Sequence, residues 1–236
     1  MTDQQKLKMD TLKTLNIKPV HPASFHYDSK NHMQNGHWSI PIVLDTLSKA
    51  QYVIEIGAWL GHTSISFAKL STLDTKIICV DPWDPQERHC RHFQNSSKKD
   101  TYEQFVSNCF ANAVENQIIP VRLDSISASK LFNYTYDLIY IDGDHSEEAV
   151  YQDLKHWYPK KSSDASLICG DDWTLFDNWA GHNQEEFNNP QERSHSSAFN
   201  EEDQKYMVRR GVKRFAQEQG IKTIQSFGRL WWFEKR

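Results

Sequence analysis

Three aspartates and one histidine stand where two apolar runs of the sequence end. Asp142 follows the run "DLIYI", His145 comes shortly after it, and Asp171 and Asp172 follow "SLICG". If the two runs are neighbouring parallel strands, their carboxyl ends meet at one edge of a sheet and the three carboxylates converge there. Converging carboxylates repel one another unless a cation lies between them, and oxygen ligands select a hard ion such as Mg²⁺. The pattern therefore predicts a divalent-metal site of Asp142, Asp171 and Asp172.

His145 lies beside this predicted metal site, at the opening of the following helix. A hydroxyl group is a poor nucleophile until it loses its proton, and a metal ion together with a neighbouring imidazole promotes that loss. We therefore predict catalytic roles for His145, as general base, and for Asp142. The alternative is a structural one, in which one carboxylate caps a helix, another faces solvent and His145 is a surface residue.

The stretch "VIEIGAWLGHTS", residues 53 to 64, carries an apolar run into two glycines and then into a hydroxyl-rich helix start. Because glycine has no Cβ atom, the backbone of such a turn can come close to a ligand. A dinucleotide fingerprint would require a glycine at Trp59, and the Gly-Lys-Ser/Thr of a phosphate-binding loop is absent. The stretch thus predicts a ligand that carries a nucleoside without a pyrophosphate.

Two acidic residues support a nucleoside ligand of this kind. Asp81 ends the next apolar run, "IICV", at about the offset from Gly57 at which a carboxylate accepts hydrogen bonds from ribose hydroxyls. Glu55, near the end of the first run, suits the cationic amino-acid end of a ligand. In the structural alternative Glu55 only caps its strand and Asp81 only precedes a proline turn.

Only a parallel sheet would bring these residues together, and the sequence has the pattern that is typical of such a sheet. Short apolar runs alternate with amphipathic helical stretches, and "KTIQSF" and "LWWFEK" near the end read as an antiparallel hairpin around Gly228 and Arg229. We predict an α/β fold with a Rossmann-like, mostly parallel seven-stranded sheet, a C-terminal antiparallel hairpin and helices on both faces. The predicted parallel strands are 52–56, 76–81, 118–123, 137–142 and 166–170.

"VIEIGAWLGHTS", "IICVDPWD" and the final hairpin resemble the class I S-adenosylmethionine-dependent methyltransferases. Within that superfamily, "DLIYIDGDHSEEAVYQDLKHWYP" followed by "SLICGDDW" resembles the metal-assisted O-methyltransferases related to macrolide-sugar methyltransferases and the cephalosporin hydroxylase-like group. The resemblance implies S-adenosyl-L-methionine as cofactor and a divalent metal, with Mg²⁺ expected. The expected cofactor-binding residues are Gly57, Ala58 and Gly61 at the methionine part, Asp81 at the ribose, Asp124, Ser125 and Trp83 at the adenine, together with Glu55 and Ser64.

The resulting hypothesis is divalent-metal-assisted O-methylation of a hydroxyl on a sugar or small metabolite. A second hypothesis takes Asp142-Gly143-Asp144 as the Asp-x-Asp metal site of a nucleotide-sugar glycosyltransferase, which leaves the glycine stretch without a role. A third is a non-catalytic module that binds the cofactor.

Composition limits the partners. A net charge of −4 without a basic run argues against nucleic acid, and no apolar stretch reaches the roughly 20 residues of a membrane span. We expect a cytoplasmic protein with reduced thiols, because its four cysteines form no Cys-x-x-Cys pair. Residues 1–37 are expected to be a helical or loop extension that could pack against a second subunit, and residues 38–236 a methyltransferase domain with a lid insertion at 173–203.

Overall fold

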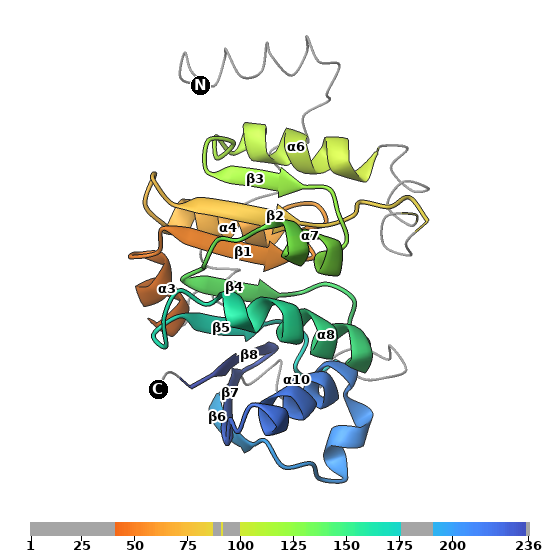
Figure 1. The fold of residues 1–236 in the computed structure, drawn as a ribbon. Helices are drawn as coiled ribbons and strands as arrows, with labels where there is room; N and C mark the ends of the chain where they lie inside the picture. The colour runs from red at the N-terminus through yellow and green to blue at the C-terminus, as the bar shows by residue number, and fades with distance from the viewer. Residues whose placement is uncertain (1–40, 87–90, 92–99, 176–190, 235–236) are drawn as a thin grey trace.

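One mixed β-sheet organises the computed structural model, which describes residues 41–86, 91, 100–175 and 191–234. Its eight strands lie in the order β3-β2-β1-β4-β5-β8-β7-β6 (Figure 1). The first five strands in the chain pair in parallel, and the last three join them antiparallel. The strands are β1 (Tyr52–Ile56), β2 (Lys76–Val80), β3 (Ile118–Val121), β4 (Leu138–Ile141), β5 (Leu167–Gly170), β6 (Glu192–Ser196), β7 (Thr223–Phe227) and β8 (Leu230–Phe233).

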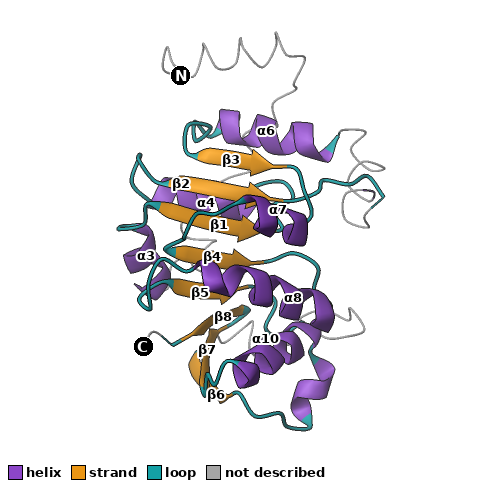
Figure 2. Ribbon diagram, in the orientation of Figure 1, coloured by secondary structure: helices purple, strands orange, loops and turns teal. Residues whose placement is uncertain are grey.

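Helices cover both faces of the sheet (Figure 2). The core on one face contains side chains of α3 (Pro41–Leu47), α4 (His62–Leu70) and α6 (Thr101–Ala111). The core on the other face contains side chains of α7 (Ser125–Leu131), α8 (Glu147–Trp157) and α10 (Met207–Glu218). Two short 3₁₀ turns, η2 (Tyr158–Lys160) and η3 (Glu202–Lys205), complete the described helices.

The two cores follow from the twofold period of the strands. Val53 belongs to one core and its neighbour Ile54 to the other, and both side chains are fully buried. Successive side chains of a strand point to opposite faces, so a sheet covered on both sides needs apolar residues at nearly every position. This is why the central strands appear in the sequence as continuous apolar runs.

Side-chain caps fix where three of the helices begin. Asp100 accepts a hydrogen bond from the backbone N–H of Glu103, at 3.0 Å, and starts α6 as the spacing of these two residues predicts. Asp124 caps α7 in the same way through Ser127, and Ser146 caps α8. The start of α8 matters most for the site, because it ends the loop that carries His145.

The predicted fold class is confirmed, and the sheet contains one strand more than the seven predicted. The additional strand, β6, lies inside the segment 173–203 that we expected to form a lid insertion. Trp173 and Thr174, at the start of that segment, are fully buried, and the lid itself stays a prediction. Residues 176–190 and the predicted extension 1–37 lie outside the described residues.

Three cysteines lie in described strands and helices. Cys79, Cys109 and Cys169 are all buried. None of the described helices is long and apolar enough to cross a membrane.

Candidate active site

The glycine stretch forms a tight corner between β1 and α4. Gly57 and Gly61 have φ angles of +90° and +84°, in the left-handed region that glycine adopts most readily. The Gly61 N–H donates to the carbonyl oxygen of Ala58, at 2.7 Å, and closes the turn. The predicted strand–turn–helix is therefore present, with α4 beginning at His62.

At Gly57 the backbone of β1 packs closely against the backbone at the end of β4. A Cβ atom added to Gly57 would lie 2.0 Å from the carbonyl oxygen of Asp142, at the end of β4. A Cβ atom on Gly61 would lie 2.9 Å from the ring of Phe105. The missing side chains thus allow β1, β4 and α6 to pack at the corner, whatever further room they leave for a ligand.

Asp81 holds the corner through the backbone. Its carboxylate accepts the N–H of Trp59 at 2.8 Å and the N–H of Trp83 at 2.6 Å. Burial raises the pKa of Asp81, although these backbone hydrogen bonds act in the opposite direction. Trp59 and Trp83 have φ angles of +40° and +45°, so Asp81 stabilises two residues in the left-handed region.

Trp83, which we predicted at the adenine, packs into the core beneath the corner. It is fully buried, and its ring centroid lies 4.8 Å from that of Phe105 and 5.0 Å from that of Tyr102. Its indole N–H donates to the carbonyl oxygen of Trp59 at 2.6 Å. In this structure Trp83 therefore supports the corner from the core side, and its predicted contact with adenine stays untested.

Glu55, predicted to bind the cationic end of the ligand, is 1% exposed. Burial raises the pKa of Glu55 to about 8, despite hydrogen bonds from Ser64 and Thr63 that lower it. The Ser64 hydroxyl donates to the Glu55 carboxylate, and the Cys79 thiol lies 3.1 Å from the Ser64 oxygen. Glu55 and Ser64 thus form a polar pair buried under the corner.

Asp124 and Ser125, at the start of α7, have structural partners. Asp124 caps the helix, and the hydrogen bonds from Ser127 lower its pKa. The hydroxyl oxygen of Ser125 accepts the indole N–H of Trp157 at 2.8 Å, which ties α7 to α8. Their proposed contact with adenine is not tested by these hydrogen bonds.

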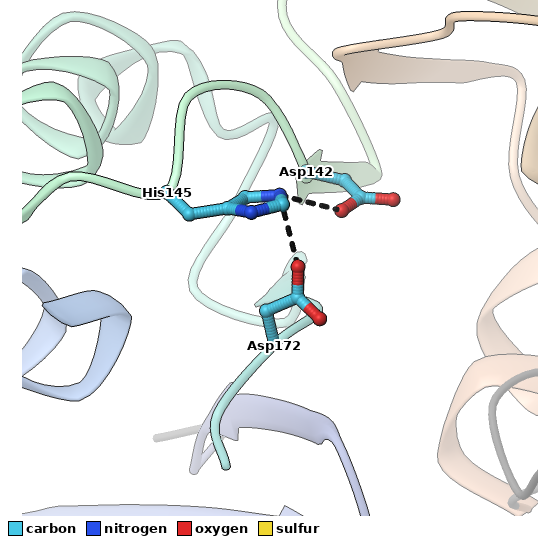
Figure 3. A group of neighbouring side chains, drawn as sticks. All are labelled: Asp142, His145 and Asp172. Atoms are coloured by element: carbon cyan, nitrogen blue, oxygen red, sulfur yellow. Dashed lines mark ion pairs between the residues drawn. The ribbon is translucent and has the colours of Figure 1, made fainter. Parts of the chain in front are cut away.

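Asp142, His145 and Asp172 come together at the carboxyl ends of β4 and β5 (Figure 3). The His145 Nε2 atom lies 2.9 Å from Asp172 Oδ2 and 3.8 Å from Asp142 Oδ1. One ligand atom from each of the three residues lies within 4.8 Å of the others, a spacing at which they could hold a metal ion. We call these three residues the acid–histidine group.

The charge of the acid–histidine group is set by its two carboxylates. Burial disfavours a charged His145, but hydrogen bonds and Coulombic attraction from Asp142 and Asp172 outweigh it and raise the pKa of His145 to about 10. Burial, followed by repulsion from Asp171 and Asp172, raises the pKa of Asp142, while the hydrogen bond to His145 lowers it. The imidazolium of His145 therefore balances the carboxylates in this state.

Asp171, the third predicted metal ligand, lies outside this group. Its Oδ2 atom accepts a hydrogen bond from Arg229 Nη2 at 2.6 Å, and its Oδ1 atom accepts the N–H of Asp172 at 2.7 Å. The structure therefore brings together Asp142 and Asp172, with His145 in the place predicted for Asp171. Sequence reasoning missed Arg229, whose only local signal is its position in the hairpin turn.

Residues 54–173 match the model of a protein family that is described as a methyltransferase domain. The chain belongs to this methyltransferase family. The matched segment runs from β1 through the glycine corner to the residue after Asp172, so it includes both parts of the site. None of the curated proteins compared with the sequence is significantly similar to it.

Solved structures share the fold of this methyltransferase domain at low sequence identity. The O-methyltransferase TomG from Streptomyces achromogenes, in complex with SAM, is 12% identical, with 98% of each chain covered and a TM-score of 0.53. A protein from Staphylococcus aureus described as a caffeoyl-CoA O-methyltransferase is 11% identical over 100% of this chain and 93% of its own, with a TM-score of 0.54. The predicted identity as a methyltransferase is confirmed.

The glycosyltransferase hypothesis is wrong, because residues 54–173 match a methyltransferase domain. It took Asp142 and Asp144 as a pair that binds a metal, and in the structure the Asp144 carboxylate accepts the N–H of Ser146 at 2.8 Å. Asp144 thereby shapes the turn that leads into α8. It also has no place in the acid–histidine group.

Proposed function

We propose that the chain is an S-adenosylmethionine-dependent, divalent-metal-assisted O-methyltransferase that acts on a hydroxyl of a sugar or small metabolite. The observation that carries the proposal is the acid–histidine group, which lies directly beside the glycine corner of a methyltransferase domain. The contact between Gly57 and the backbone of Asp142 joins the two parts. A methyl donor in the corner and an acceptor at the group would be neighbours.

The cofactor proposal rests on the corner. Gly57, Ala58 and Gly61 leave backbone without bulky side chains at the carboxyl end of β1, where open α/β sheets bind their ligands. The structure of TomG, which shares the fold, was solved with SAM. Asp81 has two backbone donors already, and each carboxylate oxygen accepts more than one hydrogen bond, so ribose hydroxyls remain compatible with it.

The residues of the acid–histidine group fit a hard divalent ion. Two carboxylates and an imidazole converge, and carboxylate oxygens suit Mg²⁺ or Mn²⁺. We propose that Asp142 and Asp172 hold the ion and that His145 remains outside its ligand set. When bound, the ion would supply Lewis acidity that lowers the pKa of the substrate hydroxyl.

His145 is the proposed proton acceptor. A general base must begin the reaction without its proton, and the two carboxylates hold the imidazole protonated in the state described here. His145 can therefore act as base only when another positive charge balances Asp142 and Asp172. The same two carboxylates fix the orientation of the ring, since Nε2 faces both.

The first experiment is calorimetric titration of the protein with S-adenosylhomocysteine, with and without Mg²⁺, and with UDP as the control nucleotide. We expect micromolar binding of S-adenosylhomocysteine and none of UDP. A screen of sugar and phenolic hydroxyl compounds would follow, with release of S-adenosylhomocysteine as the readout. Tight cofactor binding without any metal effect or turnover would instead favour the non-catalytic module.

A further inference from the structure

The turn between β7 and β8 brings a cation to the carboxylates at the end of β5. Arg229 follows Gly228 in this turn, and its Nη2 atom donates to Asp171 Oδ2 at 2.6 Å and to Asp172 Oδ1 at 2.8 Å. A single nitrogen therefore bridges two consecutive aspartates. Within the described part of the chain, the buried Arg229 Nε–H has no hydrogen-bond partner, and the two aspartates are the acceptors that orient the guanidinium.

The backbone of the hairpin binds the same segment. The Trp173 N–H donates to the carbonyl oxygen of Arg229 at 2.8 Å, and the Trp231 indole N–H donates to the carbonyl oxygen of Asp171 at 3.1 Å. Asp172, between these contacts, has a φ angle of +63°, which a residue with a side chain rarely adopts. The hairpin thus holds Asp171, Asp172 and Trp173 in one fixed conformation.

These contacts divide the two aspartates into different roles. Both carboxylate oxygens of Asp171 accept hydrogen bonds: Oδ2 from Arg229 and Oδ1 from the N–H of Asp172. Asp172 gives only Oδ1 to Arg229, and its Oδ2 atom faces His145 at 2.9 Å. We propose that Arg229 is a positioning residue: it holds Asp171 out of the acid–histidine group and presents one oxygen of Asp172 to His145.

This inference rests on the proposed function only in taking the acid–histidine group as the reacting site. Two readings of Arg229 then make opposite predictions. If Arg229 only neutralised charge, removing it would make the carboxylates more attractive to a metal ion, and a lysine would substitute for it. If Arg229 positions Asp172, its removal should weaken metal binding, because the Asp172 carboxylate would lose the donor that orients its Oδ1 atom. Lysine should restore the binding only in part, because its ammonium is carried on a flexible stem, whereas the guanidinium is planar and preorganised.

The test compares Arg229→Gln and Arg229→Lys with the wild type. A matched control is Arg214→Gln, which removes an arginine from an exposed ion pair with Glu148 on the α8 and α10 surface. Mn²⁺ binding is followed by electron paramagnetic resonance. We expect at least tenfold weaker binding in Arg229→Gln, a partial loss in Arg229→Lys and no change in the control. Tighter binding in Arg229→Gln, or wild-type binding in Arg229→Lys, would overturn the proposal.

A second readout needs no metal. The His145 ring N–H that is hydrogen-bonded to Asp172 should give a downfield proton resonance, assigned by its absence in His145→Gln. We expect the resonance to be lost or displaced in Arg229→Gln and kept in Arg214→Gln. Its persistence unchanged in Arg229→Gln, or its absence from the wild type, would contradict the proposal.

The two readouts separate this inference from the proposed function. A wild type that binds S-adenosylhomocysteine but no Mn²⁺ would remove the metal from the proposed function, and the His145 resonance would still decide the role of Arg229. Binding of S-adenosylhomocysteine by each variant, together with its near-ultraviolet circular dichroism, shows that the variant is folded. If Arg229→Gln does not fold, Arg229→Lys alone decides between the two readings through both measurements.

Discussion

The α-carbon of Gly57 packs directly against the main chain of Asp142, where an added Cβ atom would come within 2.0 Å of the carbonyl oxygen. Gly57 belongs to the glycine corner and Asp142 to the acid–histidine group. The two halves of the site are therefore fixed relative to each other by the packing of β1 against β4, and not by a flexible connection. A substitution that shifts the backbone in one half of the site should therefore also shift the other half.

Replacing Gly57 by alanine should destabilise the protein by several kcal/mol, because the new methyl group would collide with backbone that cannot move without separating two strands. Urea unfolding measures the loss, and calorimetry measures the accompanying loss of S-adenosylhomocysteine binding. Gly220→Ala is the matched control, since Gly220 also has a positive φ but no atom within 4 Å of an added Cβ. It should cost only about 1 kcal/mol. Equal effects in the two variants would contradict the packing argument.

His145→Gln should reduce turnover on a substrate from the hydroxyl screen by roughly 10²- to 10⁴-fold, the usual contribution of a general base. Binding of S-adenosylhomocysteine should stay unchanged, because His145 lies outside the glycine corner. His156→Gln removes an imidazole that is bound to the carbonyl oxygen of Gln152 within α8 and should leave turnover intact. Full activity of His145→Gln would exclude this residue as the base.

Glu55 should make the stability of the protein depend on pH in a defined direction. Its pKa is raised from 4.5 to about 8 in the folded chain. Between these two values the folded state keeps a proton that the unfolded state has lost, so stability falls as the pH rises through this range. Glu55→Gln carries no such proton, and its stability relative to the wild type should increase from pH 5 to pH 8, on the order of a few kcal/mol. Urea unfolding at both pH values provides the measurement, and parallel pH profiles would contradict burial of Glu55.

Removal of Asp203 should cost much more stability than removal of an exposed ion-pair residue. It is almost fully buried, and its carboxylate lies 2.6 Å from Lys213 Nζ and 3.8 Å from Arg209 Nη1, both also buried. Asp203→Ala would leave these cations without that carboxylate and should cost about 3–5 kcal/mol. Asp45→Ala, which breaks an exposed pair with Lys49, should cost less than about 1 kcal/mol. Thermal unfolding of both variants would show the contrast, and similar melting temperatures would refute it.

Local patterns account for what the sequence predicted well. The corner at Gly57 and Gly61, the cap of Asp100 on α6 and the alternation of strands and helices depend on residues that are close in the chain. Asp142 and Asp172 could be placed together because parallel strands end at a common edge. The same reasoning could not exclude Asp171 from the group, since its orientation depends on a residue in another part of the chain.

The direction that a side chain faces is harder to predict from the sequence. Trp83 and Glu55 stand at the strand ends where ligand contacts are expected, and both side chains are buried, while their predicted contacts with the cofactor stay untested. Strand periodicity gives the face of a residue only within the strand, and Trp83 lies beyond β2 in a left-handed conformation. The strand β6 was missed for another reason: its residues, "ERSHS", are polar and mostly exposed at the edge of the sheet.

The hairpin that carries Arg229 also imposes an order on events during synthesis. The hydrogen bond between Arg229 and Asp171 joins residues 58 positions apart, so it can form only after the intervening chain has been translated. A nascent chain that has emerged from the ribosome as far as Asp172, two residues beyond β5, already contains the glycine corner and all three members of the acid–histidine group. It lacks the part that fixes Asp172 in place. The growing polypeptide should therefore acquire its cofactor corner before it acquires a competent reaction centre.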